Sequence, residues 1–223
     1  TYGMEQMQLG EVYADVRVSK KNIEDSAFNL EAEIASEIVE QFAVLEGTEF
    51  ISGSGANDTP EGIMTNTDLK VEGTGCRHTA TTAVITMDDL LSVQYLLAEP
   101  YAKNAAWLMK RDVVGYLRTL KAATSDNYYW QPSLQLGQPP LLLGSPVYEC
   151  PDMTGLTAGL PVQNTYPIAY GDFKKGYLIG DRIGIEIQRL VELYAATNTI
   201  GFLARRRYNG QVVLSEAIKT LMI

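Results

Sequence analysis

Few residues in this chain have side chains that could support catalysis or bind a metal. His78 is the single histidine, and it lies two residues after Cys76 in the run Cys-Arg-His. Structural zinc sites take four ligands, and no other cysteine or histidine lies near this pair. We therefore interpret His78 as a loop residue and Cys76 as a small buried residue, and we expect no metal site and no cofactor.

A run of serine and glycine, Ser52 to Gly55, is the second candidate for chemistry. It lacks the Gly-x-Ser-x-Gly pattern of a nucleophile elbow, and a catalytic triad would have to recruit His78 from a distant loop. It also lacks the Gly-Lys-Ser or Gly-Lys-Thr of a phosphate-binding loop. A turn that needs positive φ angles is the simpler interpretation. A small hydrolase or ligand-binding domain that uses this turn is a remote alternative.

Two sets of charged residues suit contacts between copies of the chain better than they suit catalysis. The acidic set is Glu31, Glu37 and Glu40. The basic set is Arg205, Arg206 and Arg207. Catalytic carboxylates need a cleft and perturbed pKa values, whereas guanidinium groups can bind carboxylates at two points across an interface. We therefore expect interface residues and no enzyme activity.

The distribution of charge favours the same interpretation. The formal net charge is -9, which makes the chain a poor binder of nucleic acid. Residues 1–62 carry 3 Lys or Arg against 13 Asp or Glu, whereas residues 181–223 carry 6 against 4. Opposed surface charges orient association, so this asymmetry suits contact between copies.

Length and composition predict a folded protein with one large domain or two small ones. The chain has 223 residues, of which 46% are hydrophobic. No apolar run reaches the roughly 18 residues that span a bilayer, and no signal segment opens the chain, so we expect no membrane association and a cytoplasmic setting. Two cysteines are too few for a disulfide framework. Because the sequence begins at Thr1, we expect a processed or truncated chain.

A long helix after residue 26 is the element around which the others must pack. Its predicted apolar stripe consists of Leu30, Ile34, Ile38, Phe42 and Leu45. Ser26 or Asn29 can cap the amino end, and Gly47 is the expected stop. About 18 residues at 1.5 Å each give a rod of roughly 27 Å.

Alternation, caps and turn residues predict the remaining elements. Before and after the long helix, we expect a strand at 11–18, a connector at 19–26, and loop with a short strand at 64–82. We then expect a helix capped by Thr86 that Pro100 ends or restarts, a strand at 105–109, a helix at 111–122, and strands at 146–151 and 168–173. Residues 177–179 are expected to pair with 168–173, followed by a strand around 183–187, a helix or extended turn at 192–207, and a hairpin at Asn209-Gly210 before 211–214.

Seven segments in this order resemble the HK97-type major capsid proteins of tailed bacteriophages. They are Val16 to Ser19, Glu24 to Ser26, Ser52 to Gly62, Ala106 to Met109, Leu143 to Val147, Ala169 to Phe173, and Gly201 to Val213. The resemblance implies an α+β fold with a long spine helix, a peripheral domain and an inserted axial domain. It implies that residues 1–18 are the returning strand of an extended loop, that 19–82 with 181–223 form the peripheral domain, and that 83–180 form the axial domain.

The resemblance implies a structural protein of the virion. Copies would assemble in the bacterial host cytoplasm, as pentamers and hexamers, into an icosahedral shell around packaged double-stranded DNA that is enclosed without sequence-specific binding. A portal, a scaffold or a protease would be partners during assembly. An encapsulin-like shell around a protein cargo is the alternative. Some relatives cross-link their subunits through a Lys–Asn bond; Asn198 matches the acceptor, but Arg205 stands where the assisting Glu would fall, so we expect no cross-links.

Overall fold

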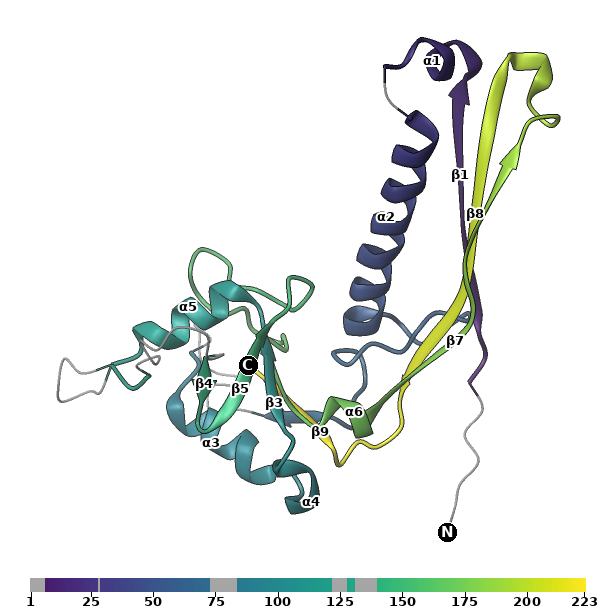
Figure 1. Ribbon diagram of the computed structural model, residues 1–223. Coiled ribbons are helices and arrows are strands. Elements are labelled where there is room, and N and C mark those ends of the chain that lie inside the picture. Colours follow the sequence, from purple (N-terminus) through teal and green to yellow (C-terminus); the bar gives the residue numbers. More distant parts are fainter. Residues whose placement is uncertain (1–6, 28, 73–83, 122–127, 131–139) are drawn as a thin grey trace. The chain divides into compact units, whose positions relative to one another are not determined.

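The computed structural model describes residues 7–27, 29–72, 84–121, 128–130 and 140–223 (Figure 1). The chain divides into two compact units, and each unit draws on two stretches of sequence. The first unit holds residues 1–61 and 179–211, and the second holds residues 62–178 and 212–223. Cys76 and His78 lie outside the described residues.

The first unit contains a three-stranded sheet in the order β1-β8-β7. The strands are β1 (Gly10–Ser19), β8 (Thr199–Val212) and β7 (Tyr177–Leu190). β1 and β8 are antiparallel, with register from Gly10 opposite Tyr208 to Ser19 opposite Thr199. Burial alternates along β1, which confirms the half-buried strand predicted there.

Helix α2 (Leu30–Ser52) runs along this sheet (Figure 1). The side chain of Asn29 caps it by accepting the Ala32 N–H at 3.3 Å, which confirms one of the two predicted caps. The predicted stop at Gly47 is wrong, because the helix continues to the cap at Gly53. A helical glycine costs about 1 kcal/mol, and the last turn offsets that cost by burying Ile51.

The core of the first unit lies between α2 and the sheet. Its buried members are Ile38, Phe42, Ile200, Phe202 and Ala204. Half-buried apolar side chains from β1, α1, α2 and β7 pack against them: Val12, Ala14, Val16, Ile23, Ile34 and Ile185. Three members of the predicted apolar stripe, Ile34, Ile38 and Phe42, therefore face the sheet. Leu30 is outside this core, and Leu45 is exposed.

Three local predictions in this unit are wrong. The expected connector at 19–26 contains the short helix α1 (Lys20–Asp25), because the Ser19 side chain caps it by accepting the Asn22 N–H. The expected helix or extended turn at 192–207 is a single 3-10 turn, η2 (Ala195–Thr197), followed by β8. The expected hairpin at Asn209-Gly210 lies inside β8, where the Asn209 side chain donates to the Gln8 carbonyl.

The second unit is built on a six-stranded mixed sheet in the order β2-β9-β6-β3-β5-β4. Its strands are β2 (Lys70–Glu72), β9 (Ile218–Met222), β6 (Ile168–Gly171), β3 (Ala106–Met109), β5 (Ser145–Glu149) and β4 (Leu141–Leu142). β6 is antiparallel to both β3 and β9, whereas β3 and β5 are parallel. The predicted pairing of 177–179 with β6 is wrong, since those residues begin β7.

Two longer helices, α3 (Met87–Leu96) and α5 (Arg111–Thr119), cover one face of this sheet. The predicted Thr86 cap is confirmed, and Asp89 completes a capping box. Pro100 restarts the chain as α4 (Glu99–Ala102), and α6 (Phe173–Gly176) follows β6. Trp107 and Tyr170 stack in the core with ring centroids 4.2 Å apart. Both central strands and both helices therefore share one core.

The two units differ from the predicted domains at three segments. Residues 179–180 were expected in the axial domain but belong to the first unit. Residues 62–82 and 212–223 were expected in the peripheral domain, but 62–72 and 212–223 belong to the second unit. The reason is strand pairing: β9 lies between β2 and β6. Among the described residues, no helix is both long and apolar enough to cross a membrane.

Candidate functional site

The charged residues predicted for interfaces lie mostly on α2 and on the sheet of the first unit. Arg206 on β8 is largely buried, with 21% of its side chain exposed. It binds the Glu46 carboxylate on α2 and donates to Asp181 on β7 at 2.9 Å. Arg206 therefore joins three elements of one chain, and the sequence alone did not place it there.

Burial raises the pKa of the Glu46 carboxyl above its ordinary value of 4.5. The positive charge of Arg206 opposes this shift, while the neighbouring carboxylates of Asp181 and Glu49 reinforce it. Desolvation outweighs the attraction because only 14% of the Glu46 side chain is exposed, so its charged form is poorly hydrated.

Tyr208 extends this cluster along β8. Its hydroxyl donates to the Glu49 carboxylate at 2.6 Å, and its ring meets Phe50 edge to face with centroids 5.7 Å apart. Burial raises the pKa of the Tyr208 phenol well above its ordinary range, so the hydroxyl stays a donor. Glu46, Glu49 and Phe50 lie within one turn of α2, which this cluster fastens to the sheet.

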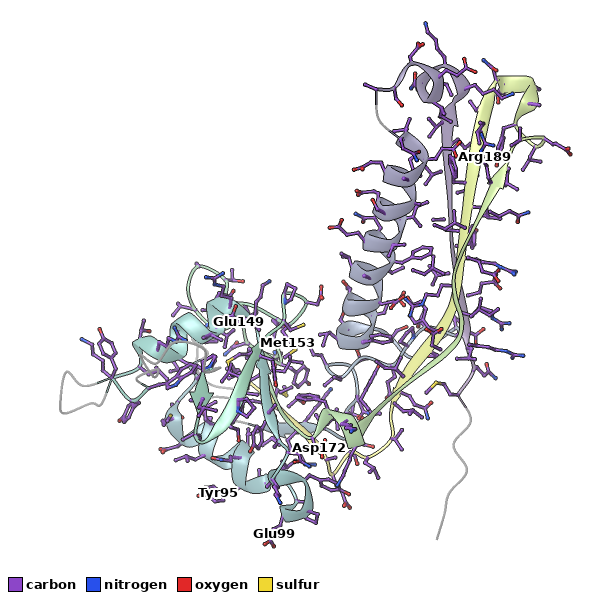
Figure 2. The ribbon with its side chains drawn as sticks, viewed as in Figure 1. Tyr95, Glu99, Glu149, Met153, Asp172 and Arg189 are labelled. Atoms are coloured by element: carbon purple, nitrogen blue, oxygen red, sulfur yellow. The ribbon has the colours of Figure 1, made fainter. Side chains whose placement is uncertain are left out.

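Glu31 and Arg205 also have partners within the chain, but they stay partly exposed. Glu31 on α2 binds Arg189 at 3.0 Å. Arg189 lies on β7 (Figure 2). Arg205 donates through two nitrogens to Glu186 at 2.7 and 2.9 Å. Exposed pairs of this kind contribute little stability, so their side chains can still exchange partners at an interface.

The other predicted interface residues face away from the core. Glu37 and Glu40 are exposed on α2, where Glu37 accepts a hydrogen bond from the Gln41 side chain at 3.2 Å. Arg207 lies opposite Glu11 in the β1–β8 register. Asn198 is exposed after η2 in the left-handed conformation, with φ of 52°. The structure thus brings these residues to one unit without joining them in one cluster.

A cluster that the sequence analysis missed lies on the outer face of the sheet. Asp15 accepts hydrogen bonds from Arg17 at 2.7 Å and from the Tyr194 hydroxyl at 2.9 Å. The Arg17 guanidinium lies 4.3 Å from the centre of the Tyr194 ring. A side chain at Gly201 would meet that ring at 2.6 Å, so only glycine leaves room for Tyr194. The residues are too far apart in sequence to predict this contact.

The serine and glycine run ends α2 and forms the turn after it. Gly55 has the expected positive φ, 69°, whereas Gly53 caps α2 with a negative φ. Ser54 and Thr59 share a hydrogen bond of 3.0 Å across the turn. The described residues contain no group of three side chains that could hold a metal ion.

The family of the chain follows from its match to a protein-family model. The family model described as the phage capsid family matches residues 1–223, which is the whole chain. The chain belongs to the phage capsid family. It is a capsid shell protein of the virion, with the α+β HK97-type fold that the sequence predicted.

Solved structures agree with this family assignment. The capsid of a native GTA particle, computed with C5 symmetry, is 33% identical to this phage capsid family member, with a TM-score of 0.81, over 96% of this chain and 72% of that chain. The structure from Microbacterium phage Oxtober96 is 14% identical to this chain, with a TM-score of 0.66, over 96% of this chain and 72% of that chain.

An encapsulin also shares the fold. The holo-SrpI encapsulin complex from Synechococcus elongatus is 13% identical to the chain, with a TM-score of 0.66, over 96% of this chain and 73% of that chain. At such low identity, the likeness shows the fold alone. No curated protein matches the chain.

Proposed function

We propose that copies of this chain assemble through pentamers and hexamers into a closed icosahedral shell. The observation that carries the proposal is the likeness to the native GTA capsid computed with C5 symmetry, at 33% identity over 96% of this chain. Fivefold symmetry in a relative of this similarity supports rings of the same kind here. Function then resides in contacts between copies, and we expect no catalytic activity.

The first unit corresponds to the peripheral domain in this proposal, and the second to the axial domain. Residues 1–18 serve as the returning strand of an extended loop, which agrees with the exposed outer face of β1. Residues 62–72 and 212–223 go with the axial domain, because they belong to its sheet.

The interface role of the charged residues takes two forms. Most of these residues contact neighbouring copies directly: Glu37, Glu40, Arg207 and Asn198. The exposed ion pairs Glu31–Arg189 and Arg205–Glu186 do the same. Arg206 acts from inside the unit by holding α2 against the sheet, because its guanidinium is buried among Glu46 and Asp181.

The shell encloses double-stranded DNA without sequence-specific binding. The net charge of -9 supports enclosure without a grip on the phosphates. A portal, a scaffold and a protease act as partners during assembly in the host cytoplasm. An encapsulin-like shell around a protein cargo remains the second candidate, because an encapsulin shares the fold at a TM-score of 0.66.

The mass distribution of the full chain in solution tests the proposal. Light scattering and negative-stain imaging of one sample should show rings of five or six, or closed shells. A monodisperse monomer at all protein and salt concentrations would overturn the assembly proposal. Shells recovered from the native host should contain DNA that is protected from nuclease. Shells that contain a protein cargo and no DNA would favour the encapsulin-like candidate.

A further inference from the structure

Helix α3 and the turn after it carry an exposed apolar surface with an acidic border. Tyr95 is 82% exposed and Leu96 is 57% exposed. Asp88 lies seven residues before Tyr95 and therefore on the same helix face, and Glu99 opens α4. Figure 2 shows Tyr95 and Glu99 projecting away from the sheet of the second unit. We call Asp88, Tyr95, Leu96 and Glu99 the acidic patch.

A second exposed apolar surface lies where α5 ends. The Tyr129 N–H donates to the Leu120 carbonyl at 3.1 Å, and the Trp130 indole donates to the Leu141 carbonyl at 2.8 Å. These bonds hold residues 128–130 between α5 and β4. Tyr128, Tyr129 and Leu141 are 47%, 52% and 48% exposed.

Two cations border this second surface and rest on its aromatic rings. The Arg118 guanidinium lies 5.0 Å from the centre of the Trp130 ring, and the Lys121 ammonium lies 5.1 Å from the centre of the Tyr128 ring. Ring contacts of this kind hold a cation in place at the border of the surface. We call Arg118, Lys121, Tyr128, Tyr129 and Leu141 the basic patch.

The named charges of the two patches are opposite. Each has a neighbour of the other sign in the sequence: Lys103 follows Glu99 by four residues, and Asp126 lies between Lys121 and Tyr128, outside the described residues. Residues 84–102 contain acidic residues and no lysine or arginine. Residues 116–121, 128–130 and 140–142 contain Arg118 and Lys121 and no acidic residue. Like patches repel each other, so a symmetric dimer that pairs a patch with itself is disfavoured.

We propose that the acidic patch of one copy binds the basic patch of the next copy within each ring. The inference rests on the proposed ring assembly and names the surfaces that build it. Contact between two different patches of the same chain is heterologous, and repeated rotation closes such contacts into a ring. Tyrosines at the centre and opposite charges at the border match the usual anatomy of an interface.

Reciprocal charge reversal tests the contact. The variants are Glu99→Lys, Lys121→Glu and the combination of both, with Glu216→Lys as an exposed acid of the same unit outside both patches. Light scattering measures the lowest protein concentration at which rings or shells form, and circular dichroism checks the fold. We expect each single variant to raise that concentration about tenfold, and the combination to restore it.

A second pair of variants tests the apolar part. Tyr95→Ser should raise the assembly concentration at least about tenfold, whereas Tyr148→Ser, at an exposed tyrosine outside both patches, should leave it unchanged. Wild-type assembly that none of the patch variants alters would overturn the inference and leave the proposed function standing. The inference would also be overturned if both single charge reversals raised the assembly concentration and the combined variant raised it equally. A wild-type chain that never assembles would instead overturn the proposed function.

Discussion

Arg206 on β8 binds Glu46 on α2, and both side chains are largely buried. The two residues are 160 positions apart in sequence, so only folding brings them together. Taking a charged pair out of water costs free energy, and the pair repays it only while both members are present. The contact therefore positions the helix on the sheet and makes each partner depend on the other.

Removing the buried cation should destabilise the first unit strongly. Arg206→Ala leaves Glu46 buried without its partner, and we expect the free energy of unfolding to fall by about 3 kcal/mol. Arg205→Ala removes only the exposed pair with Glu186 and should cost less than about 1 kcal/mol. Urea denaturation of unassembled chain measures both, and equal losses would contradict the structural role of Arg206.

Two carboxyls should titrate in opposite directions from their ordinary values. Hydrogen bonds from Arg17, and then from Tyr194, lower the pKa of Asp15 below 3.8. Asp15 therefore adds stability above pH 3.8, and that contribution is lost as pH falls through its folded-state pKa. Burial raises the pKa of Glu46 above 4.5, so the folded protein holds this proton more tightly than the unfolded chain does. The resulting contribution to folding stability is complete below pH 4.5 and is lost as pH rises through the folded-state pKa.

Carboxyl carbon chemical shifts, followed by NMR during an acid titration, check this order. The Asp15 midpoint should lie below 3.8 and the Glu46 midpoint above 4.5. Asp15→Asn should remove the part of the low-pH loss of stability that comes from Asp15, and Glu46→Gln should remove the part of the pH dependence that comes from Glu46. A Glu46 midpoint below 4.5 would show that attraction to Arg206 outweighs burial.

Two glycine-to-alanine variants in the second unit should have effects of opposite sign. A side chain at Gly171 would meet the Ala217 backbone carbonyl at 2.2 Å, so Gly171→Ala should cost about 1–3 kcal/mol. Gly115 lies in α5 with nothing within 4 Å of a new Cβ, so Gly115→Ala should gain up to about 1 kcal/mol. Melting temperatures of the two variants and the wild type measure the contrast; a loss of stability in both would refute the predicted gain at Gly115.

A buried hydroxyl pair in the same unit predicts a further effect. The hydroxyls of Tyr170 and Ser145 lie 3.1 Å apart in the core. Tyr170→Phe leaves the Ser145 hydroxyl without this partner and should cost about 1–3 kcal/mol. Tyr148→Phe removes a hydroxyl from an exposed ring and is the matched control, with an expected change near zero. Indistinguishable denaturation midpoints for the two variants would show that water satisfies Ser145.

Particles of this protein should contain no covalent cross-links between subunits. Arg205 stands where the family resemblance places the assisting glutamate, and it binds the nearby Glu186 at 2.7 Å. A denaturing gel of mature particles should show a single band at the subunit mass. A ladder of bonded subunits would refute this expectation.

Local sequence determined those elements whose signals lie within a few residues. Alternation along 11–18 identified β1, and the Thr86 cap with Asp89 three residues later identified the start of α3. The apolar stripe identified α2, and its middle members Ile34, Ile38 and Phe42 identified the side that packs on the sheet. Periodicity and capping act over one or two turns, so the order of residues alone records them.

Tertiary structure decided the rest, because its forces act between distant residues. Gly47 carries the local signal of a helix stop, yet packing of the last turn keeps α2 helical through it. Asn209-Gly210 carries the local signal of a turn, yet strand pairing keeps β8 extended through it. β9 joins the second unit because β2 and β6 supply its hydrogen bonds. The sequence shows the arginine run only as three cations. Neighbouring side chains of a strand point to opposite faces. Only the fold decides which face meets α2, so that Arg206 is buried beside Glu46 and Arg205 stays at the surface.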